Sequence, residues 1–418
     1  MPIETAKNID AQLTRTRYAE HFVERFLSMP FIPEFVFRSP QTVKTTQKEV
    51  VDLLISQGDL NILISQKCQE DPVSRDHSKT VLWATKAAQK AIQQLNGALK
   101  VAESKKPVWC VHPRRGRVEF SEGLPRITHV VAIVEVLERV QLPDDTKLPL
   151  EVRGVPVTYL SVNDLLNLAN ELRTVPEIVE YLNARRTLVP IDQRVVGDEK
   201  ALFSLYLLNS GSFEGCQRRE EATAIVAERN RQLTEFRAAK AESDRHSNLL
   251  EQVAHELATR HPNYAEDIPS ELLAAFDDPS NRTNYMLMQA VLANLRLRER
   301  AELGRAFHDT IQSMQALEEG FTYRAAYLDT MPDWVFVFAS SKKVQRGEVL
   351  RRGAMLMDGA MAHYKRRRCL LIVDRDHQSY EVALRDSDSG SPDINRAVGE
   401  QLFARLKVTD TSCAGLVP

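Results

Sequence analysis

Cysteine is scarce in this sequence, and no two cysteines have the spacing of a metal-binding or redox motif. The chain has 418 residues and five widely separated cysteines, which are Cys68, Cys110, Cys216, Cys369 and Cys413. Without a C-x-x-C pair, this distribution argues against a structural zinc site and against a disulfide framework. We therefore expect a protein of the reducing cytoplasm.

Long apolar runs are also missing. No apolar stretch approaches the roughly eighteen residues that a membrane span requires. The first residues lack a basic segment followed by an apolar run, which a secretory signal would need. We expect a soluble, unsecreted protein with no membrane partner.

Neither charge is in clear excess. Lys and Arg together number 55, and Asp and Glu together number 57. A nucleic-acid partner would therefore have to be bound by a local basic surface, because the chain has no overall positive field. No G-x-x-x-x-G-K-[ST] loop occurs, and Ser210-Gly211-Ser212 lacks the flanking pattern of a nucleophile elbow. Nothing indicates a nucleotide-hydrolysing motor.

What the sequence does contain is an alternation of helical and strand-like patterns in its first part. The predicted elements are a helix at 18–29, a two-stranded hairpin at 49–69, a helix at 78–103 after a Ser78 cap, and strands at 126–138 and 155–162. This order, helix, strand, strand, helix, strand, strand, predicts an α/β core with a mixed sheet. The predicted domains are an α/β domain at 1–165, a helical appendage to it at 166–215, a helical hairpin or bundle at 216–320, and a small C-terminal α/β domain at 321–418.

The hairpin carries charged residues in strands that are otherwise apolar. If its turn is centred on Gly58-Asp59, Asp52 lies opposite Ser65. Because side chains alternate along a strand, Asp52, Ser65, Lys67 and Gln69 all face the same side of the sheet. Unpaired buried charge is costly, so this polar group needs a reason.

Two reasons are open. In one, Asp52 and Lys67 pair diagonally and cap the edge of the sheet. In the other, a carboxylate on the first strand and a Lys on the second hold a divalent metal against a phosphate, and the Lys steers the attacking water. The motifs "KEVVDLLI" and "ILISQKCQ", followed by the helix ending "QQLNGALK", resemble the PD-(D/E)XK nuclease superfamily. The similarity is to the bacterial branch of restriction-endonuclease-like and nuclease-related-domain proteins, over about residues 18–210.

The resemblance implies a restriction-endonuclease-like core and assigns roles to individual residues. Asp52 would bind the metal, Mg²⁺ or Mn²⁺, and Lys67 would be the catalytic lysine. The family has a second carboxylate two residues before this lysine, where the present chain has Ser65. A hydroxyl replaces an anionic ligand poorly. The candidates for the missing ligand are Glu24 or Glu20 of the first helix, Glu49, which needs a bulge to reach the Asp52 face, and Gln69.

Basic residues near the hairpin are candidates for phosphate contacts that do not read sequence. They are Lys79, Lys86 and Lys90 on one helix face, and Arg114, Arg115 and Arg117 in the run His112–Arg117. Such charges more often belong simply to a solvated helix face or to an ordinary surface loop. A similar run, His363–Arg368, lies at the C-terminal end of a later predicted helix, where positive charge interacts favourably with the helix dipole.

Two functions follow. The first is a metal-dependent nuclease that hydrolyses DNA or RNA, in restriction, repair or defence. The second is a catalytically degenerate protein of nuclease fold that binds nucleic acid, or binds a protein partner through its C-terminal half. The C-terminal domain itself presents no set of convergent polar residues.

Overall fold

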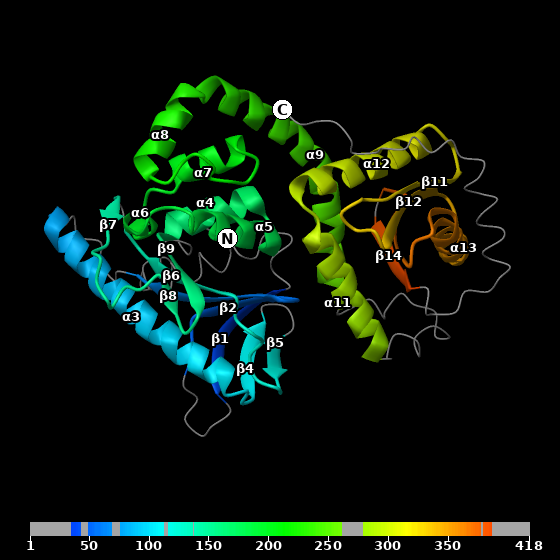
Figure 1. Ribbon diagram of the computed structural model, residues 1–418. Helices are drawn as coiled ribbons and strands as arrows, with labels where there is room; N and C mark the ends of the chain where they lie inside the picture. The colour runs from blue at the N-terminus through cyan, green and yellow to red at the C-terminus, as the bar shows by residue number, and fades with distance from the viewer. Residues whose placement is uncertain are drawn as a thin grey trace, which may run out of the picture. The chain divides into compact units, whose positions relative to one another are not determined.

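The computed structural model describes residues 35–42, 49–68, 76–112, 116–136, 138–260, 279–377 and 379–386. By its internal contacts the chain divides into two compact units, Met1–Ala238 (unit 1) and Ala239–Pro418 (unit 2), each with its own sheet (Figure 1). The helical region expected at 216–320 falls across this boundary, and the helix expected at 18–29 lies outside the described residues. None of the described helices is both long and apolar enough to cross a membrane.

An eight-stranded mixed sheet forms the centre of unit 1, in the order β5-β4-β1-β2-β3-β6-β9-β8. β1, β2 and β3 are antiparallel, whereas β6 runs parallel to β3 and β9 runs parallel to β6. The expected α/β class with a mixed sheet is therefore confirmed. The strands are β1 (Val36–Thr42), β2 (Leu53–Gln57), β3 (Leu60–Lys67), β4 (Val108–His112), β5 (Gly116–Phe120), β6 (His129–Val134), β8 (Glu151–Val152) and β9 (Val155–Leu160). A short second sheet pairs β7 (Val140–Gln141) with β10 (Val195–Val196).

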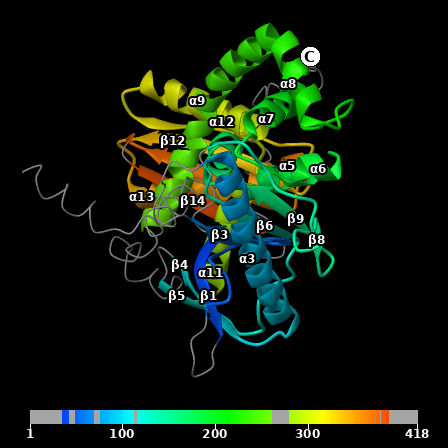
Figure 2. The same ribbon diagram turned by 90° about the vertical axis from the view of Figure 1, so that its left-hand side faces the viewer.

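Helices cover both faces of this sheet. α3 (His77–Glu103) lies across β3 and β6 on one face (Figure 2). The other face carries a helical layer (Figure 1). This layer consists of α4 (Val162–Leu172), α5 (Val175–Arg185), α6 (Pro190–Gln193), α7 (Lys200–Leu208) and α8 (Arg219–Glu228).

The β2–β3 hairpin has the register that its turn predicts. Leu54 lies opposite Leu63, and Gly58 in the turn has a φ of +56°, a value that glycine adopts without strain. Leu54 and Leu63 belong to the core under α3, so the face of the hairpin that carries Lys67 is the one that α3 covers. Asp52 precedes β2 by one residue instead of lying within the strand as expected.

α3 forms where small apolar residues recur at helical spacing. Its buried residues are Ala84, Ala87, Ala88, Ala91, Ile92, Leu95, Ala98 and Leu99. The alanines let the helix approach the sheet closely, because they add little bulk between the two backbones. The N-cap is Asp76, which accepts a hydrogen bond from the backbone N–H of Ser78, so the expected cap at Ser78 was wrong by two residues.

Three strands have no clear sequence signal. β1 contains Pro40, and Ser39 has a φ of +41°, so its pairing with β4 shifts register. β4 and β5 form a hairpin around the basic run His112–Arg117, which the sequence pattern had indicated as a loop. As a correction to that interpretation, Arg117 lies in a strand.

Unit 2 has a four-stranded sheet of order β11-β12-β13-β14, in which β12 and β13 are parallel and the outer pairs antiparallel. α13 packs on one face, and α12 packs on the other, where Phe307 stacks on Phe338 at 5.3 Å. The elements are β11 (Gly320–Ala326), β12 (Trp334–Lys342), α13 (Arg346–Tyr364), β13 (Arg368–Arg375), β14 (Ser379–Asp386), α11 (Pro279–Asn294) and α12 (Leu297–Gln315). α9 (Asn230–Arg260) spans the boundary between the units.

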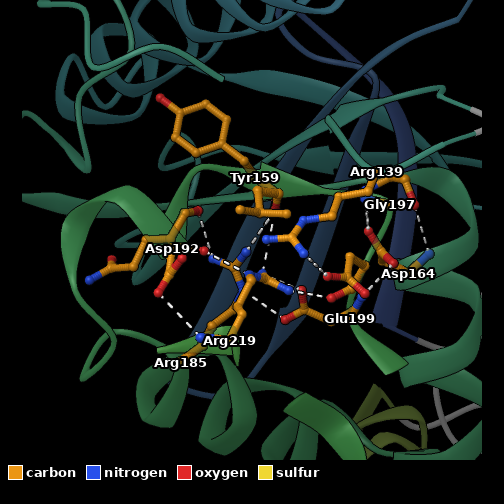
Figure 3. Close-up of polar contacts among 12 residues, drawn as sticks. Arg139, Tyr159, Asp164, Arg185, Asp192, Gly197, Glu199 and Arg219 are labelled. Carbon is orange, nitrogen blue, oxygen red and sulfur yellow. Dashed lines mark hydrogen bonds and ion pairs between the residues drawn. The ribbon is translucent and has the colours of Figure 1, made fainter. Parts of the chain in front are cut away.

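A buried ion cluster around Glu199 ties the helical layer of unit 1 to the sheet (Figure 3). Glu199 lies between Arg185 of α5 and Arg219 of α8, with a nitrogen–oxygen distance of 2.7 Å to each, and all three side chains are 2–3% exposed. The Tyr181 hydroxyl donates a third hydrogen bond to Glu199, at 2.6 Å. Arg185 also donates to the carbonyl of Tyr159 in β9, at 3.2 Å, so the cluster reaches the sheet itself.

The Glu199 carboxylate is compensated in full. Burial would raise its pKa, but the charges of Arg185 and Arg219 outweigh that effect and lower the pKa to about 2. Asp164 fixes the backbone of the loop that carries Glu199. It accepts hydrogen bonds from the backbone N–H of Gly197 at 2.7 Å and of Glu199 at 3.2 Å. The cluster is therefore a structural one, closed by its own partners.

We expect Glu199→Gln to destabilise the protein by about 3–5 kcal/mol, because it leaves two buried guanidinium groups without a counter-charge. Equilibrium urea unfolding of the two proteins measures this difference. Glu103→Gln is the matched control, since Glu103 forms an exposed pair with Arg153 and such pairs contribute little. Equal stabilities of the Glu199 and Glu103 variants would contradict the assignment.

The pH dependence of stability provides a second measurement on Glu199. A carboxylate whose pKa falls from 4.5 to about 2 on folding stabilises the folded state above pH 4.5. This contribution, about 3 kcal/mol, is lost as the pH falls from 4.5 towards 2. The stability advantage of the wild type over Glu199→Gln should therefore shrink over that interval. An advantage that stays constant from pH 6 to pH 3 would show that Glu199 is not the titrating group.

Candidate functional site

Asp52 and Lys67 meet where the first strand of the hairpin begins and the second ends. The Lys67 Nζ lies 3.5 Å from Asp52 Oδ2, and the two side chains are 26% and 17% exposed. Asp52 Oδ2 also accepts a hydrogen bond from the backbone N–H of Gln66, at 2.6 Å. The pair is partly buried and partly open to solvent, which is the exposure that a site for a polar ligand requires.

Gln94 belongs to α3, the helix that covers this face of the sheet, and it completes the site. Its Oε1 accepts hydrogen bonds from Lys67 Nζ at 2.6 Å and from Ser65 Oγ at 2.8 Å. Its Nε2 donates to Asp52 Oδ1 at 3.4 Å. One amide therefore contacts all three polar side chains that the hairpin directs toward α3. We call these four residues, Asp52, Ser65, Lys67 and Gln94, the hairpin site.

The expected convergence of Asp52, Ser65 and Lys67 on one face is confirmed. The diagonal ion pair of Asp52 and Lys67, one of the two explanations for the charges, is also present. Ser65 is fully buried, so its hydroxyl needs the partner that Gln94 provides. An ion pair of this kind does not exclude a functional site, because both side chains keep part of their surface exposed.

Glu49, a candidate for the missing carboxylate, lies three residues before Asp52, in the segment that leads into β2. It pairs with Gln41 in an isolated bridge, whereas Arg38 pairs with Leu53. Three residues of the segment before β2 thus face two residues of β1, which is the irregularity of a bulge. The bulge that Glu49 needs to reach the Asp52 face is therefore present. Glu49 is exposed, and it stays a candidate for the missing carboxylate.

Several other predicted residues cannot be placed. Glu20, Glu24, Gln69, Arg114 and Arg115 lie outside the described residues. The two candidates for a second carboxylate on the first helix therefore stay predictions. The same holds for two of the three arginines of the predicted basic loop.

The three lysines of α3 lie along the edge of the helix that carries Gln94. Lys90 precedes Gln94 by four residues and Lys86 by eight, so both occupy the helix edge that carries Gln94. Lys79 continues this edge, about 22 Å from Gln94 along the helix axis. All three side chains are exposed, as the amphipathic pattern predicts. They form a basic edge that leads to the hairpin site.

Arg117, in contrast, lies on the other face of the sheet. Its neighbours Val118 and Phe120 in β5 pack against the core under α3, so Arg117 points to the opposite side. There its guanidinium stacks on the ring of Trp109. The expectation that Arg117 neighbours the hairpin site was therefore wrong.

The donors of the hairpin site set limits on a metal. Asp52 supplies the one carboxylate and Gln94 a neutral oxygen. Within the described part of the chain, no group of three or more His, Cys, Asp or Glu side chains could hold a metal ion. Mg²⁺ commonly keeps several waters and binds through one or two carboxylates together with substrate phosphates. With Asp52 alone, the hairpin site provides one carboxylate, the smaller of these two numbers.

Gln94 is the site residue that sequence reasoning missed. It follows Ala91 by three residues and precedes Ala98 by four, so it lies on the buried stripe of α3. A polar residue among alanines on that stripe was the available signal. It indicates a buried polar partner, although only the packed structure shows that the partners are Ser65, Lys67 and Asp52.

We expect Gln94→Met to destabilise the protein by about 1–3 kcal/mol, because methionine fills a similar volume but leaves the buried hydroxyl and the ammonium without their acceptor. Urea unfolding measures the change. Gln93→Met, at the exposed neighbouring position of the same helix, is the matched control. If both variants are equally stable, Gln94 does not hold the site together.

No family model matches the sequence, and comparisons with curated proteins and with solved structures find no significant match. The function therefore has to be argued from the hairpin site and the surfaces around it.

Proposed function

We propose that unit 1 is a metal-dependent nuclease domain that hydrolyses phosphodiester bonds of DNA or RNA at the hairpin site. The observation that carries the proposal is the meeting of Asp52 and Lys67, from the two strands of one hairpin, in a partly exposed position. An acidic group that holds a cation and a lysine beside it are the two components that phosphate chemistry in such a site needs.

The arrangement of the sheet supports the proposal. β2, β3 and α3 follow one another as strand, strand, helix, and β6 comes after them once the chain has passed through β4 and β5. Apart from that inserted hairpin, this is the order of the core that the sequence motifs resemble. β6 runs parallel to β3, and the connection between them contains α3, β4 and β5. The hairpin site therefore lies between the hairpin and the helix that follows it, as a restriction-endonuclease-like core would require.

Each residue of the site has a role in this proposal. A bound Mg²⁺ or Mn²⁺ would supply positive charge at the scissile phosphate. Asp52 is its carboxylate ligand, and Gln94 offers a neutral oxygen. Lys67 presents an ammonium with three donors, which binds a phosphate oxygen or orients the attacking water. Lys90 and Lys86 contact the adjoining phosphates without reading base sequence.

A second function has its own support. Lys67 and Gln94 already satisfy one another, and both oxygens of Asp52 accept hydrogen bonds. A site whose polar groups already bond to one another suits a degenerate nuclease fold that binds nucleic acid along the basic edge of α3 and does not cleave it. The expectations of a protein partner for the C-terminal half and of a cytoplasmic location stay predictions.

We expect the purified protein to cleave single- or double-stranded DNA or RNA when Mg²⁺ or Mn²⁺ is added, and to lose this activity in EDTA. Asp52→Asn and Lys67→Met should each reduce the cleavage rate by at least about 100-fold, since each removes a group that acts on the reacting phosphate. Asp59→Asn, in the hairpin turn, is the matched control and should cleave at the wild-type rate. Cleavage that persists in both site variants would refute the proposal.

Two further variants separate the nuclease from the degenerate protein. Glu24→Gln should abolish cleavage if Glu24 supplies the second carboxylate. Ser65→Asp restores a carboxylate two residues before Lys67, and it should raise the affinity for Mn²⁺ measured by calorimetry. Wild-type protein that binds nucleic acid in EDTA, never cleaves it, and gains cleavage in Ser65→Asp would establish the degenerate function instead.

A further inference from the structure

The basic run His363–Arg368 in unit 2 forms a tight connection between a helix and a strand. α13 ends at Tyr364, and β13 begins at Arg368. Lys365 caps the helix in the left-handed conformation, with a φ of +53°. Only three residues thus separate the helix from the strand, and all three are basic.

Aromatic rings lie among these basic side chains. The Arg366 guanidinium is 5.0 Å from the centre of the Tyr327 ring, and Tyr327 is 5.6 Å from Tyr364. The Tyr364 ring in turn meets the ring of His363 at 4.8 Å and at a right angle. These contacts place the aromatic rings directly beside the basic side chains. We call Tyr327, His363, Tyr364, Lys365, Arg366 and Arg367 the aromatic–basic surface.

Two cations of this surface are exposed. Arg368, at the edge of the surface, is paired with Asp386 at 2.8 Å. A helix C-terminus is stabilised by one cation in its last turn, and His363 already lies there. Lys365 is exposed and forms no ion pair within the described part of the chain, and the Arg367 side chain is exposed as well.

Two exposed carboxylates in the facing loop, Asp329 and Asp333, keep the net charge of the region small. The surface therefore attracts anions only weakly by its net charge. Its aromatic rings can contribute binding energy as well, so it favours a ligand that combines phosphates with flat rings. Unpaired bases stack on aromatic side chains, and phosphates bind Lys and Arg, which is how single strands are bound without sequence preference. A duplex offers its phosphates but keeps its bases stacked inside.

We propose that the aromatic–basic surface of unit 2 binds single-stranded nucleic acid. Lys365 and Arg367 contact neighbouring phosphates, and Tyr364 with Tyr327 provides the platform on which a base stacks. This inference does not depend on hydrolysis in unit 1, because it assigns a separate binding surface on a different unit. It gives the C-terminal half a function that the hairpin site does not.

The test measures binding of a labelled single-stranded oligonucleotide to full-length protein in EDTA over a series of salt concentrations. In Lys365→Gln/Arg367→Gln, affinity should fall about 10-fold, and the slope of log K against log salt should drop by about 1.4, which corresponds to two lost phosphate contacts. Tyr364→Leu should also weaken single-strand binding, by about 10-fold. Duplex binding should change much less in all of these variants.

Two controls make the result specific. Arg351→Gln/Arg352→Gln removes two cations from the same helix that are paired with Glu348, and it should leave affinity and slope unchanged. Lys86→Gln/Lys90→Gln tests the basic edge of unit 1 separately, so failure of one surface is distinguishable from failure of the other. An unchanged salt slope in Lys365→Gln/Arg367→Gln, equal losses for duplex, or equal competition by polyglutamate would overturn the proposal.

Discussion

The compensation of one buried negative charge organises unit 1. Glu199 lies in the interior, where an unpaired carboxylate is costly, and the chain brings Arg185 and Arg219 to it from two different helices. Arg185, one of its partners, also bonds to a carbonyl of β9, so the cluster connects the helices to the sheet. The helical layer is thereby fixed on one face, and α3 is left to cover the face that carries the hairpin site.

The hairpin site also pairs a carboxylate with a cation, but in a different environment. Glu199 has two guanidinium partners and a hydroxyl, and it is 3% exposed. Asp52 has one ammonium at 3.5 Å and is 17% exposed. A closed, fully compensated cluster has no capacity for a ligand, whereas a partly open one with a single cation does. This difference, and not the presence of charge alone, separates a structural cluster from a candidate functional site.

The sequence was informative where interactions are local. The hairpin register followed from a turn of two residues, and the buried stripe of α3 followed from helical spacing. Contacts between distant segments carried no comparable signal: Gln94 lies 42 residues from Asp52, and the Glu199 cluster joins three helices. The β4–β5 hairpin was missed because its basic run resembles a loop, and Arg117 was misplaced because its face depends on that pairing.

The net charge of the hairpin site also constrains the order of binding. With Ser65 in place of a second carboxylate, Asp52 and Lys67 cancel, and Gln94 adds no charge. A divalent cation is therefore attracted weakly to the empty site, because its charge meets no excess of negative charge there. A phosphate bound beside Lys67 supplies that negative charge. In the nuclease proposed above, metal and nucleic acid should consequently bind together, each raising the affinity for the other, as linkage between two sites requires.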